Sequence, residues 1–322
     1  MTKSAVAERP AAGLAAVRSR LPEYGVYLAV GLLMLYNIVF TPYFLTLSNL
    51  RIQLIQVAPI VIVALGMALV IGTEGIDLSV GSVMALAAAL IPLYLGYGVV
   101  AAIGVSLAAG VAVGLINGVL VARVGLQPIV ATLAVFVGGR GLAVVVSDGQ
   151  LKDIRNPDLL HLGSGDLLGI PVLVWIAAVL VALVAFVLRR TVFGRRLLAV
   201  GGNRRAAELA GLPVGRVLIT VYVICAVLAS IAGLLSVARI QSSDASAVGL
   251  LIELSAITAV VVGGTPLTGG RVRILGTVAG AVLMQLVIAT MIKHDLGPST
   301  AEMAQAVIIL VAVWVARERK SR

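Results

Sequence analysis

Charged and aromatic side chains are scarce in this sequence of 322 residues. Only 12% of the residues are charged and 4% are aromatic, whereas 61% are hydrophobic and the mean hydropathy is +1.13. Soluble domains carry about 25% charged residues, so most of this chain requires lipid or other apolar segments as its surroundings. The composition excludes an ordinary soluble domain and predicts an all-α integral membrane protein.

The residues that build most metal sites and many enzyme sites are also nearly absent. Cys225 is the single cysteine and lies in an apolar run, so it supports no disulfide or metal framework. His161 and His294 are far apart, and the sequence has neither a nucleophile elbow nor a glycine-rich loop ending in Gly-Lys-Ser/Thr. We therefore expect no enzyme activity, no metal and no cofactor on this chain.

Apolar segments follow one another along most of the chain. A helix needs about 20 apolar residues to cross a bilayer. The sequence predicts about ten spans, at 24–44, 52–72, 79–97, 98–122, 127–147, 170–188, 216–238, 251–265, 273–292 and 299–316. We expect a membrane domain over residues 22–317, a disordered cytoplasmic tail over 1–21 and a short cytoplasmic tail over 318–322.

Basic residues are distributed unevenly between the loops of this arrangement. Seven arginines lie between Arg189 and Arg216, against the single acid Glu208. Loops rich in lysine and arginine stay on the cytoplasmic side of membrane proteins. We therefore expect both termini and residues 189–215 to be cytoplasmic and the acidic loop 148–168 to be external. This topology accounts for the net charge of +10, so we expect membrane lipid but no nucleic acid as a partner.

Two segments between predicted spans are rich in glycine. Residues 72–81 contain three glycines with Glu74 and Asp77, and residues 263–270 contain four glycines with a proline. Such interruptions free backbone groups that must find partners in protein or water. Paired interruptions in two halves of a chain point to a transporter built from repeats. Each segment is therefore either part of a solute pathway or a simple cytoplasmic turn.

Three motifs, in order along the chain, resemble the permease subunits of simple-sugar ABC importers, the ribose, xylose and galactofuranose class. They occupy residues 73–82, 198–203 with Ala206, and 259–265, and the likeness extends from about residue 50 to residue 315. The resemblance implies a type II-like permease of about ten helices, some of them interrupted, in a bacterial inner membrane. It also implies three partners: a cytoplasmic ATPase, an external sugar-binding protein, and a second copy or a paralogous permease.

In this family, residues 189–215 would form the coupling loop that receives motion from the ATPase. The sequence fits, because Asn203 is a suitable N-cap and Gly211 a suitable stop for a short helix. The alternative is a loop that only satisfies the positive-inside rule. The residues that we assign to coupling are Gly194, Arg195, Gly201, Gly202, Asn203, Arg204, Ala206, Leu209 and Gly211.

Polar residues inside apolar spans are costly and are therefore candidates for the solute pathway. Arg140 is either a pathway or ion-pair residue, or an arginine that reaches the outer headgroups. Asn117 either packs between helices or contacts sugar. The pathway candidates are Glu74, Asp77, Ser79, Asn117, Arg140, Glu253, Thr265 and Gln285.

The chain departs from the family pattern at two positions. Ser255 stands where an aspartate is common, and Glu74 stands where a small or hydroxyl residue is usual. Residues 241–249 lean towards the galactofuranose branch. The predicted function is ATP-driven import of a simple sugar by alternating access, with weak sugar binding because aromatic residues are few. The alternative is an ion-coupled secondary carrier of small polar solutes, in which Glu74 and Asp77 would be the coupling carboxylates.

Overall fold

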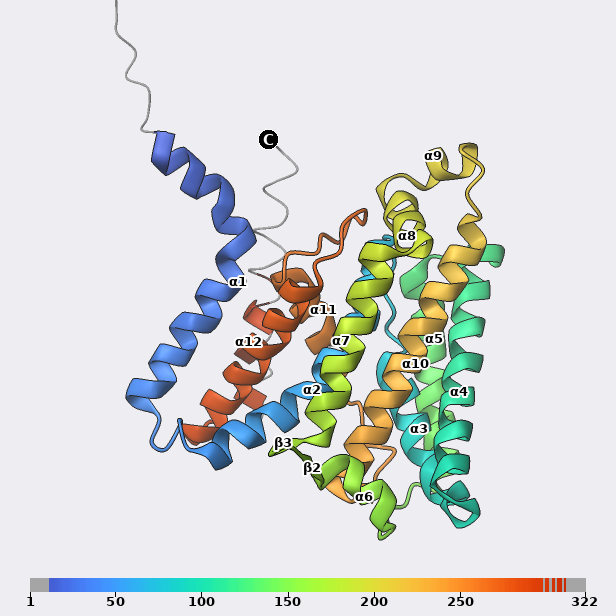
Figure 1. The fold of residues 1–322 in the computed structure, drawn as a ribbon. Helices are drawn as coiled ribbons and strands as arrows, with labels where there is room; N and C mark the ends of the chain where they lie inside the picture. Colours follow the sequence, from blue (N-terminus) through green and yellow to red (C-terminus); the bar gives the residue numbers. More distant parts are fainter. Residues whose placement is uncertain (1–11, 298, 301–302, 305, 309, 311–322) are drawn as a thin grey trace, which may run out of the picture.

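The computed structural model describes residues 12–297, 299–300, 303–304, 306–308 and 310, and this part of the chain is mostly helical (Figure 1). The helices are α1 (Ala12–Phe40), α2 (Leu47–Gly72), α3 (Val80–Tyr94), η1 (Leu95–Tyr97), α4 (Val99–Val119), η2 (Leu120–Val124), α5 (Pro128–Val146), α6 (Pro157–Ser164), α7 (Val172–Arg190), α8 (Val192–Gly202), α9 (Arg204–Leu209), α10 (Val214–Ile240), α11 (Ile252–Val262) and α12 (Ile274–Lys293). Two antiparallel strand pairs join β1 (Lys152–Asp153) to β4 (Ser242–Ser243) and β2 (Asp166–Leu167) to β3 (Ile170–Pro171).

Helix α10 lies at the centre of the bundle and packs against α2, α3 and α4. Its Tyr222 and Cys225 are fully buried, which confirms that the single cysteine is a small core residue. A Cβ atom at Gly114 of α4 would lie 2.6 Å from the Cα of Val223 of α10. Small residues of this kind let helix backbones approach closely, which is how membrane helices gain much of their packing energy.

Within the described part of the chain, seven helices are long and apolar enough to cross a membrane: α2, α3 with η1, α4 with η2, α5, α7, α10 and α12. The chain is therefore a multi-pass membrane protein. Helix α11 has only 11 residues, and the apolar part of α1 is also shorter than a full span. The expected span 299–316 lies mostly outside the described residues. The structure does not reach the count of ten, which stays a prediction.

One expectation about local structure was wrong. Helix α1 begins at Ala12, so residues 12–21 are helical rather than disordered, because alanine, leucine and arginine in this stretch are strong helix formers. Residues 1–11 and the tail 318–322 lie outside the described residues. The coupling loop contains the expected short helix, α9, and a further helix, α8, which begins where the Thr191 side chain accepts a hydrogen bond from the Gly194 N–H (3.3 Å).

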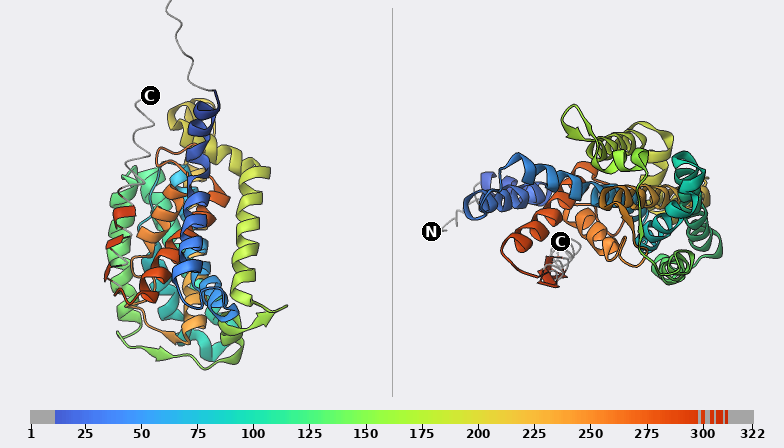
Figure 2. Two further views of the ribbon diagram at one scale, coloured as in Figure 1. Left: turned by 90° about the vertical axis from the view of Figure 1, so that its left-hand side faces the viewer. Right: turned by 90° about the horizontal axis from the view of Figure 1, so that it is seen from below.

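The loops gather at two opposite ends of the bundle. Helices α8 and α9 lie at one end, together with the loop between α11 and α12 (Figure 1). Helix α6 and the β2–β3 pair lie at the other end, and the side view agrees (Figure 2). We call these ends the α8 end and the α6 end. Each end carries one of the two sites described below.

Candidate functional site

Three glycine-rich motifs meet at the α8 end. The N–H of Gly270, in the loop before α12, donates a hydrogen bond to the carbonyl of Gly72 at the end of α2 (3.0 Å). A Cβ atom on Gly201, near the end of α8, would overlap the same Gly72 carbonyl and would lie 2.8 Å from the Gly270 nitrogen. Three backbones thus touch with no room for a side chain. We call Gly72, Gly201, Gly269 and Gly270 the glycine junction.

Helices α8 and α9 extend from this junction to the surface. Asn203 accepts a hydrogen bond from the Ala206 N–H (2.9 Å), and Gly211 has a φ of +75°, so the predicted N-cap and helix stop are both confirmed. Gly194 and Gly201 are buried, and Leu209 is 78% exposed. The other residues assigned to coupling are exposed: Arg195, Gly202, Asn203, Arg204, Ala206 and Gly211. Helices α8 and α9 are therefore packed against the bundle at Gly194 and Gly201, and their other coupling residues face away from it.

The interrupted segment 73–79 leads from the glycine junction into the bundle. Asp77 accepts hydrogen bonds from the N–H (2.9 Å) and hydroxyl (2.6 Å) of Ser79. Asn117 of α4 donates to the Ser79 hydroxyl (2.7 Å), and Thr132 of α5 accepts from the Leu78 N–H (3.1 Å). Asn117 therefore packs between elements, as one of the two interpretations held. The three pathway candidates Asp77, Ser79 and Asn117 form one fully buried polar cluster.

Two further pathway candidates lie at the α8 end. Glu74 is exposed in a left-handed conformation (φ +63°), and its side chain borders Gly269. Thr265 is buried, and its hydroxyl accepts a hydrogen bond from the Arg273 N–H (3.0 Å) just before α12. Both residues lie in the loops that contain or adjoin the glycine junction, and neither lines the cavity described next.

A cavity of about 530 Å³ lies towards the α6 end, between α2, α10, α12 and the loop 241–251. Its polar lining comes from Gln56, Ser236, Arg239, Ser242, Asp244 and Gln285, and the rest of its lining is mostly aliphatic. Gln285 Nε2 donates to the side-chain oxygens of Gln56 (2.6 Å) and Gln53 (3.1 Å). These amide contacts join α12 to α2 beside the cavity.

Arg140 of α5 holds one wall of this cavity. Its Nη1 donates to the carbonyls of Ala245 (3.1 Å) and Val248 (2.8 Å), so the guanidinium contacts protein backbone. Glu253, in the first turn of α11, is buried and attracts the Arg140 charge. The Arg140 guanidinium is therefore held by protein backbone rather than by lipid headgroups, and the described residues show no ion pair between Arg140 and Glu253.

The loop 241–251 is also ordered by its own polar contacts. Asp244 accepts hydrogen bonds from the N–H (2.8 Å) and the hydroxyl of Ser246 and from the Ala247 N–H (3.3 Å). The Ser246 hydroxyl is the main reason why the pKa of Asp244 is below its ordinary value. The Ser243 hydroxyl donates to the Ala88 carbonyl of α3 (2.7 Å). Side-chain hydrogen bonds therefore hold this loop, which forms one wall of the cavity, in its conformation.

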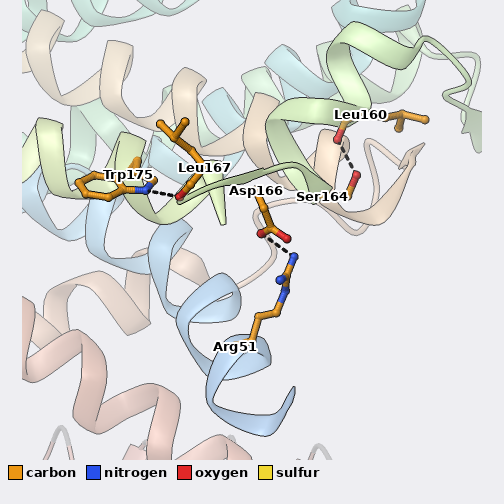
Figure 3. A network of polar contacts seen from close by, with 6 residues as sticks. All are labelled: Arg51, Leu160, Ser164, Asp166, Leu167 and Trp175. Atoms are coloured by element: carbon orange, nitrogen blue, oxygen red, sulfur yellow. Dashed lines mark hydrogen bonds and ion pairs between the residues drawn. The ribbon is translucent and has the colours of Figure 1, made fainter. Parts of the chain in front are cut away.

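At the α6 end, an ion pair joins β2 to α2. Arg51 in the first turns of α2 contacts Asp166 of β2 at 2.6 Å (Figure 3). Nearby, Trp175 Nε1 donates to the Leu167 carbonyl (3.1 Å), and the Ser164 hydroxyl donates to the Leu160 carbonyl (2.9 Å) (Figure 3). These contacts are partly exposed and belong to the surface of the molecule.

Of the eight pathway candidates, only Gln285 lines the cavity, and Arg140 holds its wall through the Ala245 and Val248 carbonyls. Sequence reasoning missed five polar lining residues: Gln56, Ser236, Arg239, Ser242 and Asp244. Gln56 could have been found, because an amide inside a predicted apolar span meets the criterion used for the other candidates. Arg239 and Asp244 lie at a span end and in a loop, where charge is ordinary and carries no signal.

Comparison with known proteins identifies the family. The family described as Branched-chain amino acid transport system / permease component matches residues 49–316. The chain belongs to this permease family. No solved structure matches the chain.

Curated relatives of this permease agree with the motifs of the sequence. Galactofuranose transporter permease protein YtfT of Escherichia coli (strain K12) is 40% identical, over 82% of this chain and 78% of that protein. Ribose import permease protein RbsC of the same strain is 39% identical, over 90% of this chain and 93% of that protein. L-arabinose ABC transporter permease protein AraH of Azospirillum brasilense is 35% identical, over 97% and 94%. The predicted resemblance to sugar permeases is confirmed.

Proposed function

We propose that this chain is the membrane-spanning subunit of an ATP-driven, binding-protein-dependent importer of a pentose or hexose. Its relatives are named as permeases for galactofuranose, ribose, arabinose and fructose. The observation that carries the proposal is the glycine junction. It brings the end of α8 into backbone contact with α2 and with the loop before α12, so a displacement of α8 and α9 must move both interrupted segments.

The exposed surface of α8 and α9 is the proposed contact for the ATPase. All seven arginines from Arg189 to Arg216 are exposed, and Arg204 pairs with Glu208 at 3.3 Å. Loops with this charge are cytoplasmic in membrane proteins. The α8 end would therefore face the cytoplasm of a bacterial cell, together with both termini, and the α6 end would face the binding protein. ATP and magnesium belong to the ATPase in this proposal.

Alternating access is the proposed mechanism. Movement of α8 and α9 would shift α2 and α12, whose opposite ends line the cavity through Gln56 and Gln285. The close-packed glycine junction favours rigid transmission, because packed interfaces shift between discrete arrangements rather than deform continuously. A second copy or a paralogous permease would complete the assembly, as the family resemblance implies.

Uptake measurements test this function. Labelled pentoses and hexoses are supplied to cells with and without the gene, under ATP depletion and separately under an uncoupler. We expect deletion of the gene to abolish uptake of one sugar. In cells that carry the gene, we expect uptake of that sugar to depend on ATP rather than on the ion gradient. Uptake that collapses only with the uncoupler would overturn the proposal in favour of the secondary carrier, with Glu74 and Asp77 as its first targets.

A further inference from the structure

We propose that Arg239, Gln56 and Gln285 form a sugar-binding site in the cavity towards the α6 end. This inference rests on the proposed function and deepens it, because it assigns the residues that would meet the solute inside the membrane domain. The three side chains come from α10, α2 and α12, so the site would sit where three spans converge.

Arg239 supplies the strongest observation. Its Nε is buried and has no hydrogen-bond acceptor within the described part of the chain, and no ion pair of Arg239 is found there. A buried donor without a partner is unfavourable, and more so when the group is charged. The side chain borders the cavity. A hydroxyl or ring oxygen of a sugar placed in the cavity would satisfy this donor.

The glutamine cluster supplies the second observation. Gln285 donates to both Gln56 and Gln53, which fixes the Gln56 oxygen towards α12. The Gln56 Nε2 then donates to no residue that the structure describes, and Gln56 borders the cavity. Amides that are held by neighbouring amides are preorganised donors and acceptors, as ligand sites require. Sugar hydroxyls both donate and accept hydrogen bonds, as the side-chain amides of Gln56 and Gln285 do.

Charge and size define the class of ligand. The lining contains one cation, Arg239, and one acid, Asp244, whose carboxylate is already bonded to Ser246 and Ala247. This balance suits a neutral polyhydroxylated molecule better than an anion. The volume of about 530 Å³ lies within the range of about 300–1,000 Å³ typical of small-molecule sites. A single pentose or hexose fits with a few waters.

The affinity of this site should be low. No aromatic side chain among the described residues lines the cavity, so this part of the chain offers no stacking contact of the kind that strengthens sugar binding. We expect a dissociation constant near 1 mM, which corresponds to about 4 kcal/mol. Weak binding suits a permease that must release the sugar to the other side.

Protection of an engineered cysteine tests the site directly. Ser242→Cys places a thiol in the cavity lining, while the native Cys225 is fully buried and gives little background labelling. Membranes are labelled with a maleimide in the presence of ribose, arabinose, galactose or fructose at millimolar concentration. Leu168→Cys, on the 87%-exposed hairpin residue, is the matched control that no sugar should protect.

Two variants then separate recognition from structure. In the Ser242→Cys background, Arg239→Met keeps the aliphatic stem but removes every donor, and we expect protection to be lost. Arg239→Lys keeps the charge but lacks Nε, and we expect protection to need about tenfold more sugar. Both variants should label at the Leu168→Cys position as the parent does, and this shows that the fold is intact. If the Arg239→Met variant does not insert into the membrane, the sugar concentration that protects the Arg239→Lys variant still tests the role of Arg239.

Failure of this inference is distinguishable from failure of the proposed function. If the parent takes up a sugar under ATP control but no sugar protects Ser242→Cys, the cavity is not the binding site. Unchanged protection in both Arg239 variants would overturn the role of Arg239 while leaving the importer in place. If no sugar is taken up and none protects, the sugar assignment itself falls, and this inference falls with it.

Discussion

The two ends of the bundle are built in different ways. At the α8 end, Gly72, Gly201 and Gly270 touch backbone to backbone and leave no space for a Cβ atom. At the α6 end, side chains such as Arg140 and Gln285 hold elements around a cavity of about 530 Å³. A backbone contact transmits displacement, whereas a side-chain contact can exchange partners. The difference agrees with the proposals that the α8 end carries mechanical coupling and that the α6 end carries solute recognition.

The largest predicted effect tests the close contact at the α8 end. Gly201→Ala places a methyl group onto the Gly72 carbonyl, so α8 must move away from α2. We expect sugar uptake to fall by about tenfold or more, equivalent to about 1.4 kcal/mol or more of lost coupling. Uptake by complemented cells measures the effect, and immunoblotting of membranes checks that the chain is still inserted.

The neighbouring glycine provides the control. A Cβ atom on Gly202 would meet no heavy atom within 4 Å, and Gly202 is exposed. Gly202→Ala should therefore transport as the parent does. Equal losses in both variants would mean that flexibility of α8, rather than close approach, is what these glycines provide, and the comparison between the two ends would fail.

Sequence reasoning reached the motifs of the α8 end but not their contact. Hydropathy and glycine pattern located residues 72–81 and 263–270, and the family resemblance located residues 198–203, because each is a local feature. That Gly201 lies against Gly72 and Gly270 depends on how three distant segments fold together, and no single sequence carries that information. The Asn203 cap was predictable because a cap is made within four residues.

The cavity was harder to predict, for a physical reason. Among its polar lining residues, Gln56 and Gln285 are amides inside apolar spans, whereas Arg239 and Asp244 lie at a span end and in a loop, where charge is ordinary. Arg140 and Glu253 were recognised as unusual, since charge inside a span is costly, but their partners across the bundle were not. The cost of burying a charged side chain can be recognised from its own segment of sequence. The group on another helix that offsets this cost cannot be recognised in that way.

The second prediction tests whether side chains hold the cavity wall. Arg140→Met removes the donors to the Ala245 and Val248 carbonyls. Hydrogen bonds to charged groups contribute about 1.5–3 kcal/mol, so we expect a clear drop in thermal stability in detergent. Arg155→Met is the control, because Arg155 is 90% exposed and 3.9 Å from its acid. Equal melting temperatures in the two variants would show that the wall does not depend on Arg140.

The third prediction concerns pH at the same wall. Hydrogen bonds from Ser246 and Ala247 lower the pKa of Asp244 below its ordinary value of 3.8. A lowered pKa means that the charged form stabilises the folded loop above pH 3.8 and that this contribution disappears as the pH falls through the folded-state pKa. The stability difference between the parent and Asp244→Asn should therefore be constant near neutral pH and shrink below about pH 4. A difference that grows on acidification would contradict this assignment.

The smallest effect is expected for the ion pair between Arg51 and Asp166 at the outer surface. The distance of 2.6 Å is short, but the two side chains are 38% and 40% exposed. Water screens such pairs, so their contribution is about 0–1 kcal/mol and falls with salt. A double-mutant cycle with Arg51→Met and Asp166→Asn, read from thermal unfolding, should give a coupling energy below about 1 kcal/mol. A larger, salt-independent value would mean that the cover over the α6 end is as rigidly joined to α2 as the glycine junction is, and the division between a rigid end and an adaptable end would no longer hold.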